Sequence, residues 1–187
     1  MDAFFPAFMA ALLAEIGDKT QLLALALALH FRRIAPVLLG IALAALANSA
    51  LAALAGVLLA PMLTHEAAVL MLALALFFAG GGAMIKQSSP EPVQTSRLGP
   101  VLVSFLAFFV LELGDKTQFL TFAIALRSGS FWLTMAGATA GVLLISAAVV
   151  ITGRAWERLP VTSVRRAIGV LFALLGLWAA VLALRLI

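Results

Sequence analysis

The chain contains no cysteine, only two histidines and few charged residues. Without cysteine it can form no disulfide and no thiolate metal site, and it has no cysteine nucleophile. Only 11% of its 187 residues are charged, against about 25% in soluble domains, whereas 65% are hydrophobic. The composition therefore excludes an ordinary soluble domain and predicts an integral membrane protein.

Common enzyme motifs are missing as well. The sequence has neither the HExxH motif of zinc proteases nor the Gly-x-Ser-x-Gly motif of serine hydrolases. Both histidines, His30 and His65, fall between apolar segments, so neither is placed at the middle of a span. We therefore expect no enzyme, and a membrane-embedded metal-dependent enzyme is kept as a minor alternative.

Six apolar segments account for most of the chain. They cover about residues 4–29, 37–60, 67–85, 101–126, 131–152 and 167–184, close to the ~20 residues that a membrane helix needs. We predict an all-α integral membrane protein with six transmembrane helices. The proline-containing stretch 87–100 is predicted to link a first three-helix repeat, 1–86, to a second, 101–187.

A polar motif interrupts the first and the fourth segment. Residues 15–21 read EIGDKTQ and residues 112–118 read ELGDKTQ, an offset of 97 positions. A charged residue at the centre of a spanning helix costs about 2.5–3.5 kcal/mol on insertion scales, so two such motifs indicate a function. Since each half has an odd number of spans, the second half enters the membrane in the opposite sense. This inverted-repeat plan is typical of secondary transporters with a site near the midplane.

The motif supplies oxygen ligands for a cation. On a continuous helix Glu15, Asp18 and Lys19 share one face, whereas Thr20 points away. If the two equivalent faces meet, four carboxylates and two ammonium groups converge with a net charge of −2, which matches one divalent cation or two protons. We predict that the metal ligands are Glu15, Asp18, Glu112 and Asp115. Oxygen ligands favour calcium, manganese or magnesium over copper or zinc.

Exchange for protons follows from the same groups. A carboxylate removed from water can hold a proton near neutral pH until a metal ion displaces it. Other side chains are expected to support the site: Lys19 and Lys116 by ion pairing, Gln21, Gln118, Thr20 and Thr117 as further polar groups, Gly17 and Gly114 by loosening the helix, and Asn48, Ser49 and Ser146 as second-tier candidates. For the last three, packing between helices is the favoured interpretation.

The basic residues predict the orientation in the membrane. Eight of them follow the first, third and fifth segments: Arg32, Arg33, Lys86, Arg97, Arg154, Arg158, Arg165 and Arg166. The opposite side has only Arg127 and Arg185. The positive-inside rule then places both termini outside the cytoplasm, and we expect a multi-pass protein of the cell's inner membrane. The net charge of +4 is explained in this way, without a nucleic-acid partner.

The doubled motif resembles the signature E-x-G-D-[KR]-[ST] of the Gdt-type divalent cation/proton exchangers, and both copies match it at every position. The resemblance implies that the two Glu and two Asp residues bind manganese or calcium, which leaves the cytoplasm in exchange for protons, with no permanent cofactor. The short chain is most similar to bacterial manganese exporters of that family. Small relatives can have Asn-His where this chain has Asn48-Ser49, so a histidine contribution is missing here. A divalent cation channel is the main alternative, and the sequence leaves a homo-oligomer open.

Overall fold

The computed structural model describes residues 2–85, 98–158 and 160–185, without the side chains of residues 154, 157 and 158. Within these ranges all regular structure is helical, which confirms the all-α class. The helices are α1 (Phe4–Glu15), α2 (Lys19–Phe31), α3 (Ile34–Leu59), α4 (His65–Met84), α5 (Pro100–Glu112), α6 (Lys116–Ser128), α7 (Phe131–Thr152) and α8 (Val161–Ala183), with short 3-10 helices η1 (Ala60–Met62) and η2 (Gly153–Arg158). Most of the predicted linker, residues 87–97, lies outside the described residues.

Four of the helices are long and apolar enough to cross a membrane: α3 together with η1, α4, α7 and α8. The first and fourth predicted spans are instead divided into two shorter helices each, α1 with α2 and α5 with α6. The prediction of one continuous helix through each polar motif is therefore wrong. The chain leaves the helical conformation at the centre of both motifs.

A glycine in the left-handed region produces each break. Gly17 and Gly114 both have φ +76°, which costs a residue with a side chain about 1–2 kcal/mol. The freed amide of Gly17 donates a hydrogen bond to Gln21 Oε1 at 3.0 Å, and that of Gly114 donates to Gln118 Oε1 at 2.6 Å. The glutamine at the third position of each new helix thus caps the break that precedes it, which gives the first and last residues of the shared GDKTQ sequence a structural role.

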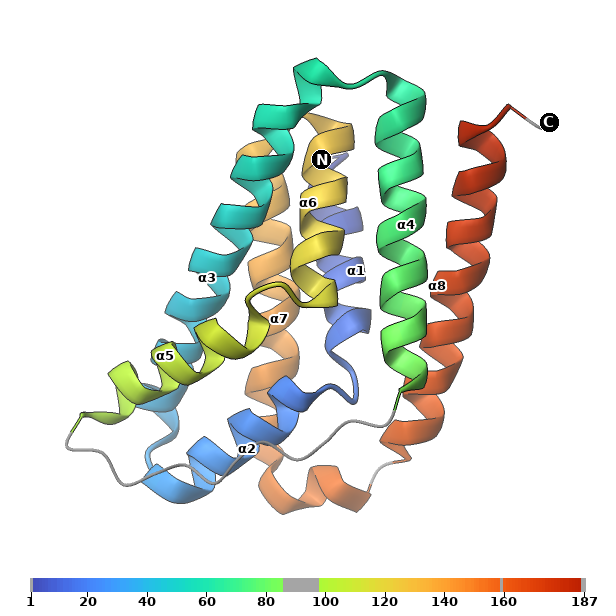
Figure 1. The fold of residues 1–187 in the computed structure, drawn as a ribbon. Coiled ribbons are helices and arrows are strands. Elements are labelled where there is room, and N and C mark those ends of the chain that lie inside the picture. The colour runs from blue at the N-terminus through green and yellow to red at the C-terminus, as the bar shows by residue number, and fades with distance from the viewer. Residues whose placement is uncertain (1, 86–97, 159, 186–187) are drawn as a thin grey trace.

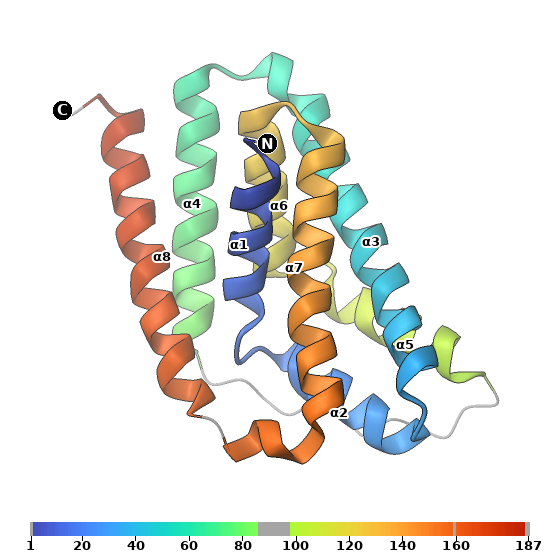
Figure 2. The same ribbon diagram turned by 180° about the vertical axis from the view of Figure 1, so that it is seen from behind.

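The breaks lie inside a bundle (Figures 1 and 2). Helices α1 and α6 lie side by side between α3 and α7 on one flank and α4 and α8 on the other. The start of α1 and the end of α8 are at the same end of the molecule, while the end of α2 and the start of α8 are at the opposite end (Figure 1). Both breaks therefore fall well within the thickness of the bundle, away from either end.

Glycines let the two halves of the chain interlock. A Cβ atom added at Gly40 of α3 would lie 2.4 Å from the Val101 carbonyl oxygen of α5. The same contact recurs at the offset of 97 residues, because a Cβ at Gly137 of α7 would lie 2.3 Å from the Phe4 carbonyl oxygen of α1. Each half thus supplies the long helix on which the divided span of the other half rests, and this packing fixes where the two breaks meet.

Candidate metal centre

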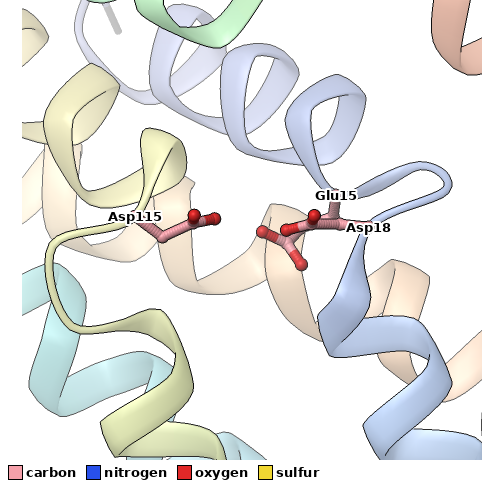
Figure 3. Close-up of side chains that lie close together, drawn as sticks. All are labelled: Glu15, Asp18 and Asp115. Carbon is pink, nitrogen blue, oxygen red and sulfur yellow. The ribbon is translucent and has the colours of Figure 1, made fainter. Parts of the chain in front are cut away.

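Three carboxylates meet where the two breaks face each other. Glu15 ends α1, Asp18 precedes α2 and Asp115 precedes α6, and Figure 3 shows the three side chains turned toward one another. One oxygen from each lies within 4.8 Å of the other two. Calcium binds oxygens at about 2.3–2.6 Å, so oxygens on opposite sides of one such ion are about 5 Å apart. The three carboxylates are therefore spaced to contact a single cation.

Ion pairs cross from one motif to the other. Lys116 Nζ lies 2.6 Å from Asp18 Oδ2 and 3.5 Å from Asp115 Oδ2, and Lys19 Nζ lies 3.5 Å from Asp115 Oδ1. Both aspartates occupy the N-cap position of their helix, and neither side chain makes the usual capping hydrogen bond. The lysines do pair with carboxylates, as expected, and each pairs with the acid of the opposite motif.

Glu15 accepts a hydroxyl hydrogen bond at each oxygen. Thr20 Oγ1 donates to Oε2 at 2.5 Å and Thr117 Oγ1 donates to Oε1 at 2.6 Å, and all three side chains are buried. The expectation that Thr20 points away from the acids is therefore wrong. The break resets the helical phase between Glu15 and Thr20, and this rotation brings the hydroxyl back to the carboxylate.

Glu112 is buried at the end of α5 but does not join the group of three carboxylates. It lies beside Asn48, whose Nδ2 also donates to the Phe109 carbonyl at 3.2 Å and whose Oδ1 accepts from Gln118 Nε2 at 3.4 Å. Asn48 thus links α3 to the second break. Ser49 and Ser146 are buried in α3 and α7, and no hydrogen bond joins either described hydroxyl to the acids.

Several carboxylate oxygens of the site are buried without a hydrogen-bond donor. They include Asp18 Oδ1, Asp115 Oδ2 and Glu112 Oε1. A buried polar atom without a partner is unfavourable and rare in folded proteins. Among the described residues, the ammonium groups paired with these acids are those of Lys19 and Lys116, both from the motifs. This donor-poor arrangement leaves oxygens available to a cation.

The comparisons with known proteins agree with this arrangement. The family described as "Divalent cation/proton antiporter GDT1" matches residues 3–92 and 100–185. The chain belongs to this family of membrane transporters. It is also 37% identical over 170 residues to a Vibrio cholerae serotype O1 protein named "Putative manganese exporter", covering 90% of this chain and 85% of that one. No solved structure matches the chain.

The two breaks have different surroundings. Gly17 is covered by α8: Arg165 Nη1 donates to its carbonyl oxygen at 3.4 Å, and Val161 packs against it. Trp156 Nε1 donates to Gln21 Oε1 at 3.1 Å. Around Gly114, by contrast, an added Cβ would meet no atom within 4 Å. The first break is closed by the second half of the chain, whereas the second break is open.

Sequence reasoning missed Arg165 and Trp156, which help to close the first break. It assigned Arg165 to the membrane surface as a topology determinant, yet this side chain is 8% exposed. At the offset of 97 residues the position of Arg165 corresponds to Ala68 and that of Trp156 to Leu59. An arginine and a tryptophan that occur in only one repeat are a signal in the sequence that could have indicated this difference between the two breaks.

Alanine substitutions at the two glycines test this difference. Gly114→Ala is expected to lower the free energy of unfolding by about 1–2 kcal/mol, the cost of the left-handed conformation. Gly17→Ala should cost about 1–3 kcal/mol more, because its Cβ would lie 3.0–3.1 Å from Val161 and Arg165. Denaturant titration in detergent micelles measures both. Equal losses would show that α8 does not cover the first break.

Proposed function

We propose that the protein exports a divalent cation from the cytoplasm in exchange for protons, manganese being the preferred ion and calcium the next. The observation that carries this proposal is the buried meeting of Glu15, Asp18 and Asp115, whose oxygens lie within 4.8 Å of one another. Family membership supports exchange for protons. The name of the Vibrio relative supports manganese.

The charges of the site suit an exchange of one divalent cation against two protons. The four motif acids and two motif lysines carry a net charge of −2, so one divalent ion neutralises them. Without the ion, protons on the carboxylates achieve the same balance. We assign Glu15, Asp18 and Asp115 to direct binding, with Glu112 as the fourth ligand once it turns from Asn48. The lysines and threonines hold the acids in place between turnovers.

The proposed architecture is six spans in two inverted three-helix repeats. Every helix of the first half has a counterpart in the second at the offset of 97 residues, including the paired breaks at Gly17 and Gly114. In Figure 1 the divided span α1–α2 descends through the bundle, whereas α5–α6 ascends. Broken helices whose ends meet near the midplane are the usual binding site of such transporters.

The orientation proposed is that both termini face away from the cytoplasm. Among the described residues, Arg32, Arg33 and Arg166 lie at the end of the molecule where α2 ends and α8 begins, whereas Arg127 and Arg185 lie at the opposite end. The positive-inside rule then assigns the first end to the cytoplasm. In a bacterial cell this corresponds to the inner membrane, with metal moving toward the end that bears the termini.

Metal uptake into inverted membrane vesicles tests the exchange. With an acidic lumen, manganese should accumulate against its gradient, and added manganese should raise the lumenal pH as protons leave. Calcium should be taken up more slowly under the same conditions. Vesicles without the protein serve as the control. A channel would instead give downhill flux that persists after an ionophore has collapsed the pH gradient, with no accumulation at any gradient.

A further inference from the structure

A cavity of about 640 Å³ lies beside the second break. Its walls come from α3, α4, α6 and the residues of the second break. Small residues of α3, Ala52 and Ala55, leave the room, and Asp115 and Gln118 are its polar lining. Cavities of roughly 300–1,000 Å³ are the size that binds small organic molecules.

Three phenylalanines form the apolar wall of this cavity. Phe78 of α4 meets Phe119 of α6 edge to face at 5.9 Å between ring centroids, and Phe119 stacks on Phe122 at 6.0 Å. The electron-rich faces of aromatic rings attract ammonium groups, and cages of aromatic rings bind quaternary ammonium ions. A carboxylate beside such rings adds the charge that an organic cation needs.

The aromatic wall occurs in only one of the two repeats. At the offset of 97 residues Phe119 corresponds to Leu22, Phe122 to Leu25 and Phe78 to Leu175. The motif acids, by contrast, are the same in both repeats. The acids that would bind a metal ion occur in both repeats, so metal binding does not explain why phenylalanines are found at one break only. The phenylalanine wall therefore indicates a second kind of ligand.

We propose that this cavity binds a lipophilic ammonium ion, with the ammonium group at Asp115 and the apolar part against Phe78, Phe119 and Phe122. Asp115 is the most accessible of the three clustered carboxylates: its side chain is 16% exposed, against 1% for Asp18. Its lysine partners stand at 3.5 Å, whereas Lys116 holds Asp18 at 2.6 Å. Asp115 Oδ2 accepts no hydrogen bond and pairs with Lys116 Nζ at the longer distance of 3.5 Å.

The ligand reaches the cavity from the lipid. Leu51 and Phe78, which line it, are about half exposed on the outer surface of the bundle, as is Leu113 of the second break. In a bilayer such a surface faces acyl chains, so an amphiphilic cation arrives already concentrated in the membrane. Because it uses Asp115, it competes with the metal ion. The inference rests on the proposed function for this competition, whereas binding itself does not require transport.

Equilibrium dialysis of the purified protein in detergent with radiolabelled benzyltrimethylammonium tests the site. We expect saturable binding of one ion per chain, displaced by Mn²⁺. Neopentylbenzene, which has carbon in place of the charged nitrogen, should displace the probe at least about tenfold less well, since it lacks the attraction to the rings and to Asp115. Displacement by both compounds at equal concentrations would mean an apolar cavity for lipid chains and would overturn the proposal.

Replacing Phe119 and Phe122 with leucine gives the second repeat the residues that the first repeat has at the equivalent positions, Leu22 and Leu25. Phe119→Leu and Phe122→Leu together should weaken binding about tenfold or more while manganese uptake continues, which also shows that the variant is folded. Leu22→Phe, the reciprocal change at the first break, is the matched control and should leave binding unchanged. Unaltered binding by the double variant, or no saturable binding by the native chain, would refute the inference. Failure of manganese uptake in the native chain with binding intact would count against the proposed function alone.

Discussion

Replacing Asp18 with asparagine is expected to reduce metal transport at least about 100-fold, because the amide removes a charged oxygen ligand from the centre of the site. The same change should destabilise the protein. Lys116, whose side chain is only 6% exposed, would lose its partner at 2.6 Å. Removing one member of a buried ion pair costs about 3–5 kcal/mol, since the other charge stays buried. Metal uptake and denaturant titration in detergent measure the two effects.

A second variant separates these effects. In Asp18→Asn combined with Lys116→Met both buried charges are gone, so the free energy of unfolding should recover most of the loss. Transport should stay absent, because the ligand is still missing. Glu66→Gln is the control: this acid pairs with Arg185 at the surface, away from the site, and its loss should leave uptake unchanged. Normal uptake by the single Asp18 variant would disprove the assignment of the metal centre.

Gly137→Val is expected to lower the free energy of unfolding by at least about 3 kcal/mol and to abolish transport. A Cβ at this position would lie 2.3 Å from the Phe4 carbonyl oxygen and 3.1 Å from the Phe8 amide nitrogen. Overpacking commonly costs about 1–3 kcal/mol and more where backbone blocks the new atoms. Helix α1 would have to move away from α7, and Glu15 at the end of α1 would move with it.

Gly81→Val provides the matched control within a helix. A Cβ at Gly81 of α4 meets no atom within 4 Å, and valine is a better helix former than glycine. This variant should therefore unfold at the same denaturant concentration as the native protein or slightly above it. If valine at position 137 is tolerated equally well, the close contact between α1 and α7 does not hold the divided span in place.

Much of this molecule could be predicted from composition and repetition. Long apolar segments predicted the helices, and the twin motif identified the acids that meet in the structure. Loosening of the helix at Gly17 and Gly114 was predicted, but the complete break at each motif was not, because a helix tolerates a glycine and hydropathy does not report φ. That error carried over to Thr20, whose direction was deduced from a continuous helix.

Contacts between the repeats could not be predicted from the sequence either. Lys19 and Lys116 each begin a helix of their own half, and nothing in the local sequence shows that they pair with the acid of the other half. The covering of Gly17 by Arg165 depends on where α8 lies after folding. An arginine near the end of a span fits a surface position equally well from its sequence alone.

The crossed pairing also has a consequence for the way the protein is made. During translation Glu15 and Asp18 enter the bilayer while Lys116 and Thr117, which later contact them, have not yet been synthesised. Until the second repeat has been inserted, the acids of the first repeat therefore lack the ion-pair and hydrogen-bond partners that the second repeat supplies. Despite their similarity, the two halves therefore depend on each other for partners of their buried acids.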